Sequence, residues 1–444
     1  MLARRLNAFD ATLIVLGGIV GVGIFQNPSV VAARAHTPGL IMAAWLFGGI
    51  VALAGGFVFA ELAWRRPDVG GLYVYMRDAY HPALAFMYGW TALLVMQSGG
   101  MALAAITFAF YVAPHVHTGT SGIAVAVLII FSAINCVGVR EGGSMQNVLM
   151  LLKLATIAVL VGVGFVVSPN TAHATASLPA LPPVAFLALM GGALIPVLYA
   201  YDGWQTASFL SGELKEPARS LPRGLVWGVL IVIVLYIAVN LTALRVLGAA
   251  GLAATNTPAS DIMRHAIGPA GEWVIAAFIA LSALGFLSNQ ILTSPRIYFA
   301  MAQDGLFFSQ VAWLHPTTRS PVVAIALQGL AAIIITVSGR YDQILNYVTS
   351  MDFVFFALAA VALFRFKRAT DVSAQKAPGM LVPGHPWTTL FFIGVSVAIV
   401  LNSWWAYPGD TLKGVGILLV GGPVYYLWRA WGAKAGIKRE IGNK

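Results

Sequence analysis

Long runs of apolar residues recur along the whole chain, and short polar segments between them hold almost all of its charges. Each run has roughly 20 residues, enough for a helix to cross about 30 Å of hydrocarbon. This pattern predicts an all-α polytopic membrane protein with twelve transmembrane helices. The predicted spans are 10–34, 39–62, 82–112, 122–138, 145–167, 185–210, 222–246, 270–300, 321–338, 343–363, 387–406 and 412–430.

The composition agrees with this assignment. Of the 444 residues, 59% are hydrophobic and only 9% are charged, whereas soluble domains carry about 25% charged residues. We expect no cleavable signal peptide, because the first apolar run is too long and continues directly into the repeating pattern. The single cysteine, Cys136, excludes an internal disulfide framework.

The net charge of +10 reflects topology. With the N-terminus inside, nearly all Lys and Arg between the predicted spans fall on the cytoplasmic side, as the positive-inside rule requires. Lys153 lies inside a span, and the outer side holds only Arg34, Arg245, Arg264, Arg340 and Lys413. We therefore expect both termini to be cytoplasmic, the lipid bilayer to be the surroundings, and no nucleic-acid partner.

The first span is interrupted by glycine. It carries Gly17-Gly18 and then Gly21-Val22-Gly23-Ile24-Phe25 in its middle, and each helical glycine costs about 1 kcal/mol relative to alanine. Unwound backbone inside a membrane is tolerated only where it is buried in protein or lines a polar cavity. A broken first span therefore indicates a binding site at the midplane, which is typical of secondary transporters.

The sixth span has a matching interruption, with Pro196 followed by Tyr201-Asp202-Gly203. Five spans separate the two breaks, so the second unit is inserted upside down relative to the first. We predict a ten-span core over 1–366 (repeats 10–167 and 185–363), a cytoplasmic linker over 367–386, and two added spans with a tail over 387–444. The alternative is that the glycines only allow close helix packing.

Four segments in the right order resemble the amino acid–polyamine–organocation transporter superfamily, near its L-type amino acid transporter branch and the bacterial exchangers related to it. The resemblance implies a LeuT-type 5+5 inverted repeat with broken helices 1 and 6. The segments are Gly21–Phe25; Glu61-Leu62-Ala63 with Pro67, Gly70-Gly71 and Tyr73-Val74-Tyr75; Ala200–Trp204 with Gly212–Pro217 and Leu221-Pro222-Arg223; and Thr293–Arg296 with Ala302–Gly305.

An amino acid zwitterion must find partners for a carboxylate and an ammonium. Unpaired N–H groups where the second half of span 1 begins, at Gly21, Val22, Gly23 and Ile24, can receive the carboxylate. Free carbonyls where the first half of span 6 ends, at Leu198, Tyr199, Ala200 and Tyr201, can receive the ammonium. The glycines would let the ligand approach the main chain closely.

Side chains near these breaks would select the substrate. The candidates are Tyr199, Tyr201, Asp202 and Trp204, together with Gln97 and Ser98 of span 3. The aromatic residues either gate the pocket or simply pack. An acidic group inside a membrane is a functional hypothesis by default. Asp202 either attracts a cationic side chain or caps the second half-helix of span 6; the capping role is favoured.

Lys153 lies inside span 5, where a buried cation is costly unless it is paired. The family resemblance implies that a lysine at this place substitutes for the sodium ion of related carriers. It would then bridge the start of span 1 to Ser282, Ser288 or Asn289 of span 8, and the carrier would be sodium-independent, with proton coupling through Lys153 left open. The alternative is that the side chain snorkels to the headgroups.

These features favour a carrier over an enzyme or a channel, because only Asp202 and Lys153 are expected as intramembrane charges. The leading hypothesis is a sodium-independent exchanger or proton-linked carrier for neutral L-amino acids. The alternative is a cationic amino acid or polyamine antiporter of the same fold. No cofactor and no metal site are expected. The loop Ala113–Gly122 lacks cysteine, so we expect no disulfide-linked heavy chain and a bacterial-type protein of the cell inner membrane.

Overall fold

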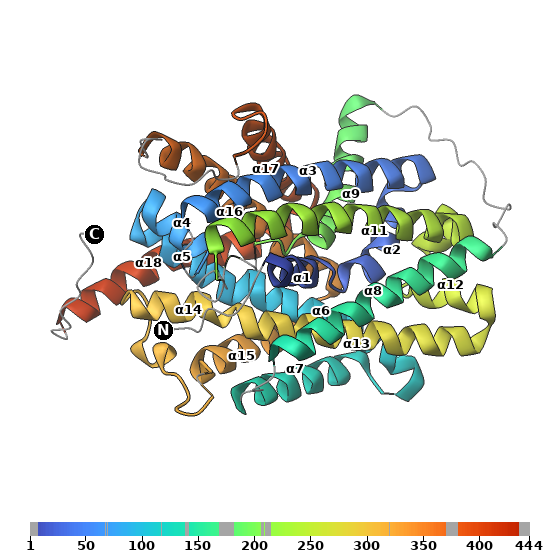
Figure 1. Ribbon diagram of the computed structural model, residues 1–444, viewed down its shortest axis with the longest axis horizontal. Helices are drawn as coiled ribbons and strands as arrows, with labels where there is room; N and C mark the ends of the chain where they lie inside the picture. The colour runs from blue at the N-terminus through green and yellow to red at the C-terminus, as the bar shows by residue number, and fades with distance from the viewer. Residues whose placement is uncertain are drawn as a thin grey trace.

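The computed structural model of the chain describes residues 8–66, 68, 70–116, 118–137, 142–167, 182–205, 208, 215–318, 320–369 and 381–434. Within these residues the regular structure is helical throughout, without a strand. The long helices run side by side in one elongated bundle, with the broken first helix near its centre (Figure 1). The expected all-α class is therefore confirmed.

The helices follow the apolar runs closely. They are α1 (Ala8–Ile19), α2 (Gly23–Ala35), α3 (Pro38–Arg65), α4 (Leu72–Ala79), α5 (Pro82–Thr91), the π-helical turn η1 (Ala92–Met96), α6 (Gln97–Val116), α7 (Thr120–Val137), α8 (Gly142–Val166), α9 (Pro183–Tyr201), α11 (Pro217–Ala253), α12 (Pro258–Ile267), α13 (Pro269–Thr293), α14 (Pro295–Gln303), the 3₁₀ turn η4 (Ser309–Ala312), α15 (Val322–Ser338), α16 (Tyr341–Ala369), α17 (Trp387–Ala406) and α18 (Pro408–Lys434).

The helices confirm a multi-pass membrane protein. Within the described residues, six helices are long and apolar enough to cross a membrane by length and composition, or seven if the bent pair α1–α2 counts as one span. Shorter apolar helices accompany them, at Thr120–Cys136, Met150–Val166, Leu189–Tyr201 and Val322–Ser338. The predicted span 387–406 coincides with α17, whereas the end of span 185–210 falls partly outside the described residues.

Proline sets many of the helix starts. Pro38, Pro217, Pro258, Pro269 and Pro295 all occupy the first turn of a helix, where the missing N–H is no loss and the fixed φ suits the helix. One of them splits a predicted element. Span 270–300 is divided at Ser294-Pro295 into α13 and α14, which the apolar pattern alone does not reveal.

The first span is broken as predicted. α1 ends at Ile19, α2 begins at Gly23, and the two helix axes differ by 41°. The turn between the two helices is buried: Val20 is fully buried and Val22 is 1% exposed. The unwound turn therefore sits inside protein, which is where a membrane protein can accommodate it.

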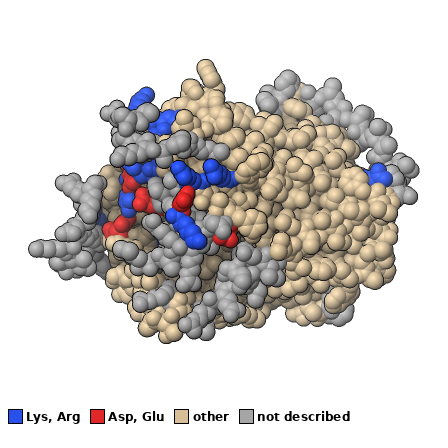
Figure 2. Space-filling model, viewed as in Figure 1, with Lys and Arg blue, Asp and Glu red and all other residues tan. Residues whose placement is uncertain are grey.

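On the face of the bundle that Figure 2 shows, most of the charged residues gather toward one end. Lys, Arg, Asp and Glu concentrate where α4, α5 and α14 lie, at the left in the figures, while the visible flank is almost uncharged (Figure 2). The Glu61 side chain at this end is fully buried and accepts hydrogen bonds from Arg65 and from the Val382 backbone N–H, at 2.7 and 2.8 Å. Glu61 also forms an ion pair with Lys367 at 3.2 Å.

Candidate functional site

The break between α1 and α2 is held by side chains from other helices. The Lys153 ammonium of α8 donates to the Val20 carbonyl at 3.1 Å, and the Tyr236 hydroxyl of α11 lies 2.9 Å from the Ile19 carbonyl oxygen. The α2 helix starts at Gly23, and Val22 before it supplies no side-chain cap. At such a helix start the amides of Gly23 and Ile24 have no acceptor within the helix. The Gly21 N–H, which was also expected to be unpaired, instead donates to the Ile19 carbonyl at 2.7 Å.

The break after α9 is closed by its own residues. α9 ends at Tyr201, Asp202 is extended, and Gly203 adopts a φ of +117°, which favours glycine. The Gly203 N–H donates to the Asp202 carboxylate at 2.6 Å. The same N–H also donates to the Gln205 side-chain oxygen at 3.2 Å. Most of the predicted second half-helix of span 6 lies outside the described residues, so its capping by Asp202 stays a prediction.

The two breaks lie directly against each other. A Cβ on Gly203 would meet the Gly18 carbonyl oxygen at 2.2 Å, and a Cβ on Gly23 would meet the Ala200 Cα at 3.0 Å. The Tyr236 hydroxyl, already close to Ile19, is also 3.0 Å from the Ala200 carbonyl oxygen. One hydroxyl group therefore bridges the unwound ends of both helices.

The glycines serve helix packing here. The space that a Cβ of Gly21 would fill is occupied by the Phe286 ring, at 2.7 Å, and the space beside Gly23 is occupied by the backbone of α9. This is the packing role that small residues commonly have in membranes. Both glycines also line the cavity described below, and their expected role of admitting a ligand to the main chain stays a prediction.

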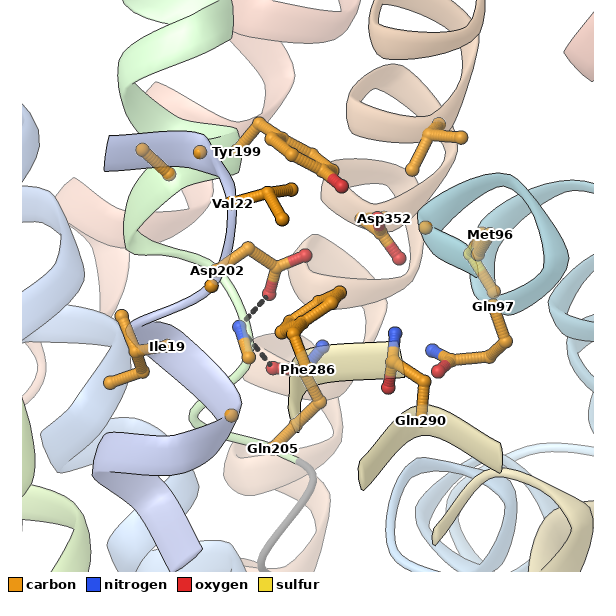
Figure 3. Close-up of a pocket in the computed structure, with 17 residues that line it drawn as sticks. Ile19, Val22, Met96, Gln97, Tyr199, Asp202, Gln205, Phe286, Gln290 and Asp352 are labelled. Atoms are coloured by element: carbon orange, nitrogen blue, oxygen red, sulfur yellow. Dashed lines mark hydrogen bonds between the residues drawn. The ribbon is translucent and has the colours of Figure 1, made fainter. Parts of the chain in front are cut away.

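A small cavity of about 40 Å³ lies between the two breaks. Its wall combines Gln97, Phe286, Gln290 and Asp352 with residues of the two breaks, which are Gly18, Ile19, Gly21, Val22, Gly23, Tyr199, Ala200, Asp202 and Gly203 (Figure 3). Such a volume has room for water.

The structure adds an acid to the site that the sequence analysis missed. Asp352 of α16 is 6% exposed, lines the cavity, and directs its carboxyl group toward that of Asp202 (Figure 3). Our expectation that Asp202 and Lys153 are the only intramembrane charges was wrong. The signal was present in the sequence, because Asp352 stands well inside the predicted span 343–363.

The predicted substrate-binding residues divide into two groups. Gly21, Val22, Gly23, Tyr199, Ala200 and Asp202 line the cavity, whereas Ile24, Leu198, Tyr201 and Trp204 do not. Tyr201 packs against Trp45 and Tyr236, and Trp204 packs against Phe59 and Phe356. In this structure these two aromatic side chains therefore pack against other rings, and a role for them in substrate binding stays a prediction.

The two candidates on span 3, Gln97 and Ser98, directly follow the π-helical turn η1. η1 precedes Gln97, and such turns often mark functional sites. Gln97 lines the cavity and its side-chain oxygen accepts from the Ser294 hydroxyl at 2.7 Å. Ser98 faces elsewhere: its hydroxyl donates to the Leu93 carbonyl at 2.5 Å, inside the π turn.

Lys153 is buried, with 1% exposure, and lies 5.8 Å from the centre of the Phe286 ring. Its ammonium therefore ends at the span 1 break, not at the headgroups. Its predicted partners on α13 are Ser282, Ser288 and Asn289, and no hydrogen bond joins it to them among the residues described. The Ser282 hydroxyl and the Asn289 side-chain nitrogen are buried without a partner there, so the proposed bridge to span 8 stays untested.

A larger hollow of about 710 Å³ opens at the end of the bundle opposite the charged cluster. Arg34, Arg340, Tyr341, Asn346 and Asp410 contribute to its wall. A layer of side chains lies beneath it. The Tyr341 hydroxyl donates to the Asn27 side-chain oxygen at 3.0 Å, and the Asn27 amide donates to the Pro196 carbonyl at 2.7 Å.

The charged end is closed by a polar network. Arg77 of α4 forms an ion pair with Asp304 at 2.7 Å, and the Tyr73 hydroxyl donates to the same carboxylate at 2.6 Å. Burial, reinforced by the adjacent Asp304 carboxylate, raises the pKa of the Tyr73 hydroxyl. This tyrosine therefore stays a hydrogen-bond donor at physiological pH and ties α4 to the end of α14.

Comparison with known proteins identifies the family of the chain. The amino acid permease family model matches residues 6–425. The serine/threonine exchanger SteT of Bacillus subtilis (strain 168) is 30% identical over 438 residues, covering 96% of this chain and 97% of the relative. The large neutral amino acids transporter small subunit 2 of Mus musculus is 26% identical, covering 97% and 82%. The b(0,+)-type amino acid transporter 1 of Mus musculus is 26% identical, covering 85% and 79%.

The family match spans nearly the whole chain, including both helix breaks and the cavity between them. The relatives are named as transporters and exchangers, not enzymes. The expected resemblance to the L-type and bacterial exchanger branch of the amino acid–polyamine–organocation superfamily is confirmed. The chain therefore belongs to the amino acid permease family and is a multi-pass membrane transporter of amino acids.

Proposed function

We propose that this carrier moves neutral L-amino acids across the cytoplasmic membrane without sodium, as an exchanger or a proton-linked carrier. The observation that supports this most directly is the Lys153 ammonium at 3.1 Å from the Val20 carbonyl. It places a hydrogen-bond donor of the protein itself on a carbonyl of the unwound turn, where a sodium-dependent carrier would use an ion. A built-in donor needs no sodium gradient to hold the break in shape.

The substrate would bind across both breaks. Its carboxylate would accept hydrogen bonds from the first amides of α2, at Gly23 and Ile24, where the helix dipole also favours an anion. Its ammonium would bind carbonyls at the end of α9. Of the four carbonyls predicted for this, Tyr199 and Ala200 belong to residues that line the cavity. The first already accepts from the Asp202 N–H and the second lies near the Tyr236 hydroxyl, but each carbonyl oxygen has a second lone pair for the ammonium.

Alternating access would require the two ends to open in turn. The hollow lined by Arg34 and Arg340 would be the outer vestibule, and the cluster around Asp304 and Glu61 would be the closed cytoplasmic gate. This orientation follows the positive-inside rule. The proposed topology also includes twelve spans in a 5+5 arrangement, a core over 1–366, a linker over 367–386, two added spans within 387–444 and cytoplasmic termini.

The substrate class rests partly on the relatives. One is named a serine/threonine exchanger and another a large neutral amino acids transporter, which supports neutral substrates. A cationic amino acid or polyamine antiporter is the second candidate. It is favoured by one observation: Asp202 and Asp352 face the same cavity, and within the described residues neither forms an ion pair with a basic side chain.

We further propose that the carrier works without a disulfide-linked partner. The mouse relative is named as a small subunit. The only cysteine of this chain, Cys136, lies near the end of α7 and not in the loop between α6 and α7. Non-reducing electrophoresis of purified protein should therefore show no disulfide-linked species, and a reducible larger band would contradict this.

Exchange by purified protein in liposomes tests the function. Vesicles preloaded with one amino acid are offered each of the twenty labelled amino acids outside, with sodium or choline and with or without a pH gradient. We expect saturable exchange of neutral amino acids that is equal in sodium and choline. Accumulation that needs sodium would contradict the assignment of Lys153. Preferential exchange of lysine, arginine or polyamines would favour the second candidate.

A further inference from the structure

Two carboxyl groups from different helices meet at the cavity. Asp202 follows α9, and Asp352 lies in the middle of α16; the two are close enough for a side-chain hydrogen bond (Figure 3). Asp352 is 6% exposed, and its chain neighbours in α16, Met351 and Phe353, are fully buried. Within the described part of the chain, no Lys, Arg or His forms an ion pair with either acid.

Electrostatics forbids two full charges here. Like charges in contact repel by about 4 kcal/mol even at an effective dielectric constant near 20, and paired buried carboxyl groups characteristically share one proton. A hydrogen bond between two carboxyl groups also requires a proton on one of them. The pair is therefore expected to carry one proton and one negative charge.

The geometry indicates which member holds the proton. The Asp202 carboxylate accepts the Gly203 N–H at 2.6 Å, and a hydrogen bond to the charged form stabilises that form. No backbone amide among the described residues donates to Asp352. Asp352 is therefore expected to carry the proton, and its hydroxyl donates a hydrogen bond to the Asp202 carboxylate.

The surroundings contain no basic group in contact to override this. The titratable groups that interact electrostatically with both acids are the hydroxyls of Tyr199 from α9 and Tyr88 from α5. From α6 and α13 come the neutral amides of Gln97 and Gln290. Lys153 of α8 is committed to the Val20 carbonyl and does not line the cavity.

A second observation indicates that the cavity exchanges protons with water. Gln290 is 7% exposed, and its side-chain oxygen is buried without a hydrogen-bond partner among the described residues, as is the Tyr199 hydroxyl. Both side chains border the cavity that the acids face (Figure 3). The cavity has room for water, and water bound to these groups would connect the acid pair to whichever side of the membrane opens.

We propose that Asp202 and Asp352 form a proton-binding site that holds one exchangeable proton beside the substrate. This rests on the proposed function, and it deepens that function by assigning the proton of a proton-linked carrier to this pair. In the exchange step the Oδ–H bond of Asp352 breaks and the proton passes to cavity water, with no change of oxidation state. A cationic group entering the cavity would displace the same proton.

Infrared difference spectroscopy of the lipid-reconstituted protein detects a protonated carboxyl group directly. Between about pH 5 and about pH 8, the wild type should show a protonated-carboxyl band that Asp352→Asn loses. Asp342→Asn is the matched control, because it makes the same change at an exposed position of the same helix. If Asp352→Asn does not fold, Asp202→Asn replaces it: the band should shift, because the acceptor becomes an amide.

Liposome exchange by the same proteins gives the functional arm. In the wild type the half-saturating substrate concentration should vary with pH, by up to about tenfold per pH unit, the limit for one proton. In Asp352→Asn, which imitates the protonated pair, this dependence should disappear, while Asp342→Asn should keep it.

The two hypotheses fail in different ways. Absence of exchange in the wild type, with the band still lost in Asp352→Asn, would overturn the proposed function and leave the proton site standing. A band that survives unchanged in Asp352→Asn, or an unshifted one in Asp202→Asn, would overturn the proton site. An unaltered pH dependence in an Asp352→Asn carrier that exchanges amino acids would overturn it too.

Discussion

The two helix breaks lie against each other but are stabilised in different ways. At the α1–α2 break, donors from other helices satisfy the carbonyls: Lys153 serves Val20 and Tyr236 serves Ile19. At the break after α9 the chain uses its own residues, with Gly203 at a φ of +117° and its N–H bound by Asp202. The first break is fixed by the tertiary structure, and the second by its local sequence.

This difference assigns separate tasks to the two breaks. The first presents the amides of a helix start in a fixed frame, which suits the part that all amino acids share. The second places an ionisable group beside the cavity, where Asp352 can reach it. We infer that recognition common to all substrates depends on the first break, and that charge selection depends on the second.

The largest expected effect is at the second break. In Gly203→Ala, the new Cβ would be strained by the positive φ and would lie 2.2 Å from the Gly18 carbonyl oxygen. Strain and overpacking each cost about 1–3 kcal/mol, so we expect little folded protein, measured by fluorescence-detected size-exclusion after heating. Gly394→Ala is the control, because no atom lies within 4 Å of its new Cβ. Equal recovery of both variants would show that the two breaks are not in tight contact.

Much of the fold could be predicted because membrane helices need long apolar runs. The run 387–406 became α17 residue for residue, and glycines that are weak helix formers marked the first break. The π-helical turn at Ala92–Met96 could not be found this way. Its residues form an ordinary apolar sequence, and the turn depends on how Ser98 bonds to the Leu93 carbonyl.

The site was predicted less completely, for two physical reasons. The role of Gly21 depends on which neighbour fills the space beside it, and only the tertiary structure reveals that Phe286 does. Asp352 was visible in the sequence as an acid within an apolar run. Its partner Asp202 stands 150 positions away in the sequence. No local pattern links the two residues, and only the tertiary structure brings them to one cavity.

The next effect sharpens the role of the first break. Lys153→Ala should leave the buried Val20 carbonyl without its charged donor, a loss of about 1.5–3 kcal/mol. We expect amino acid exchange in liposomes to fall by roughly 10- to 100-fold. Lys413→Ala, at an exposed lysine of α18, should exchange like the wild type. Normal exchange by Lys153→Ala in choline would refute a functional role for this ammonium.

Tyr236 tests whether the two breaks are mechanically joined. Tyr236→Phe removes the hydroxyl that bridges the carbonyls of Ile19 and Ala200, and leaving buried acceptors unpaired costs about 1–3 kcal/mol. The melting temperature in detergent should therefore fall, whereas Tyr426→Phe, at a residue that is 61% exposed, should leave it unchanged. If both variants melt alike, the hydroxyl does not stabilise the contact between the breaks.

The smallest expected effect separates the charge of Asp202 from its role as a hydrogen-bond acceptor. Asp202→Asn keeps a side-chain oxygen that can accept the Gly203 N–H, whereas Asp202→Ala removes it. Loss of such a local acceptor costs about 1 kcal/mol, so the alanine variant should unfold at a lower temperature than the asparagine variant. If the two variants unfold at the same temperature and below the wild type, the negative charge itself stabilises the break. The second break would then resemble the first, where a charged group from α8 binds the unwound turn, and the contrast between local and tertiary stabilisation would no longer hold.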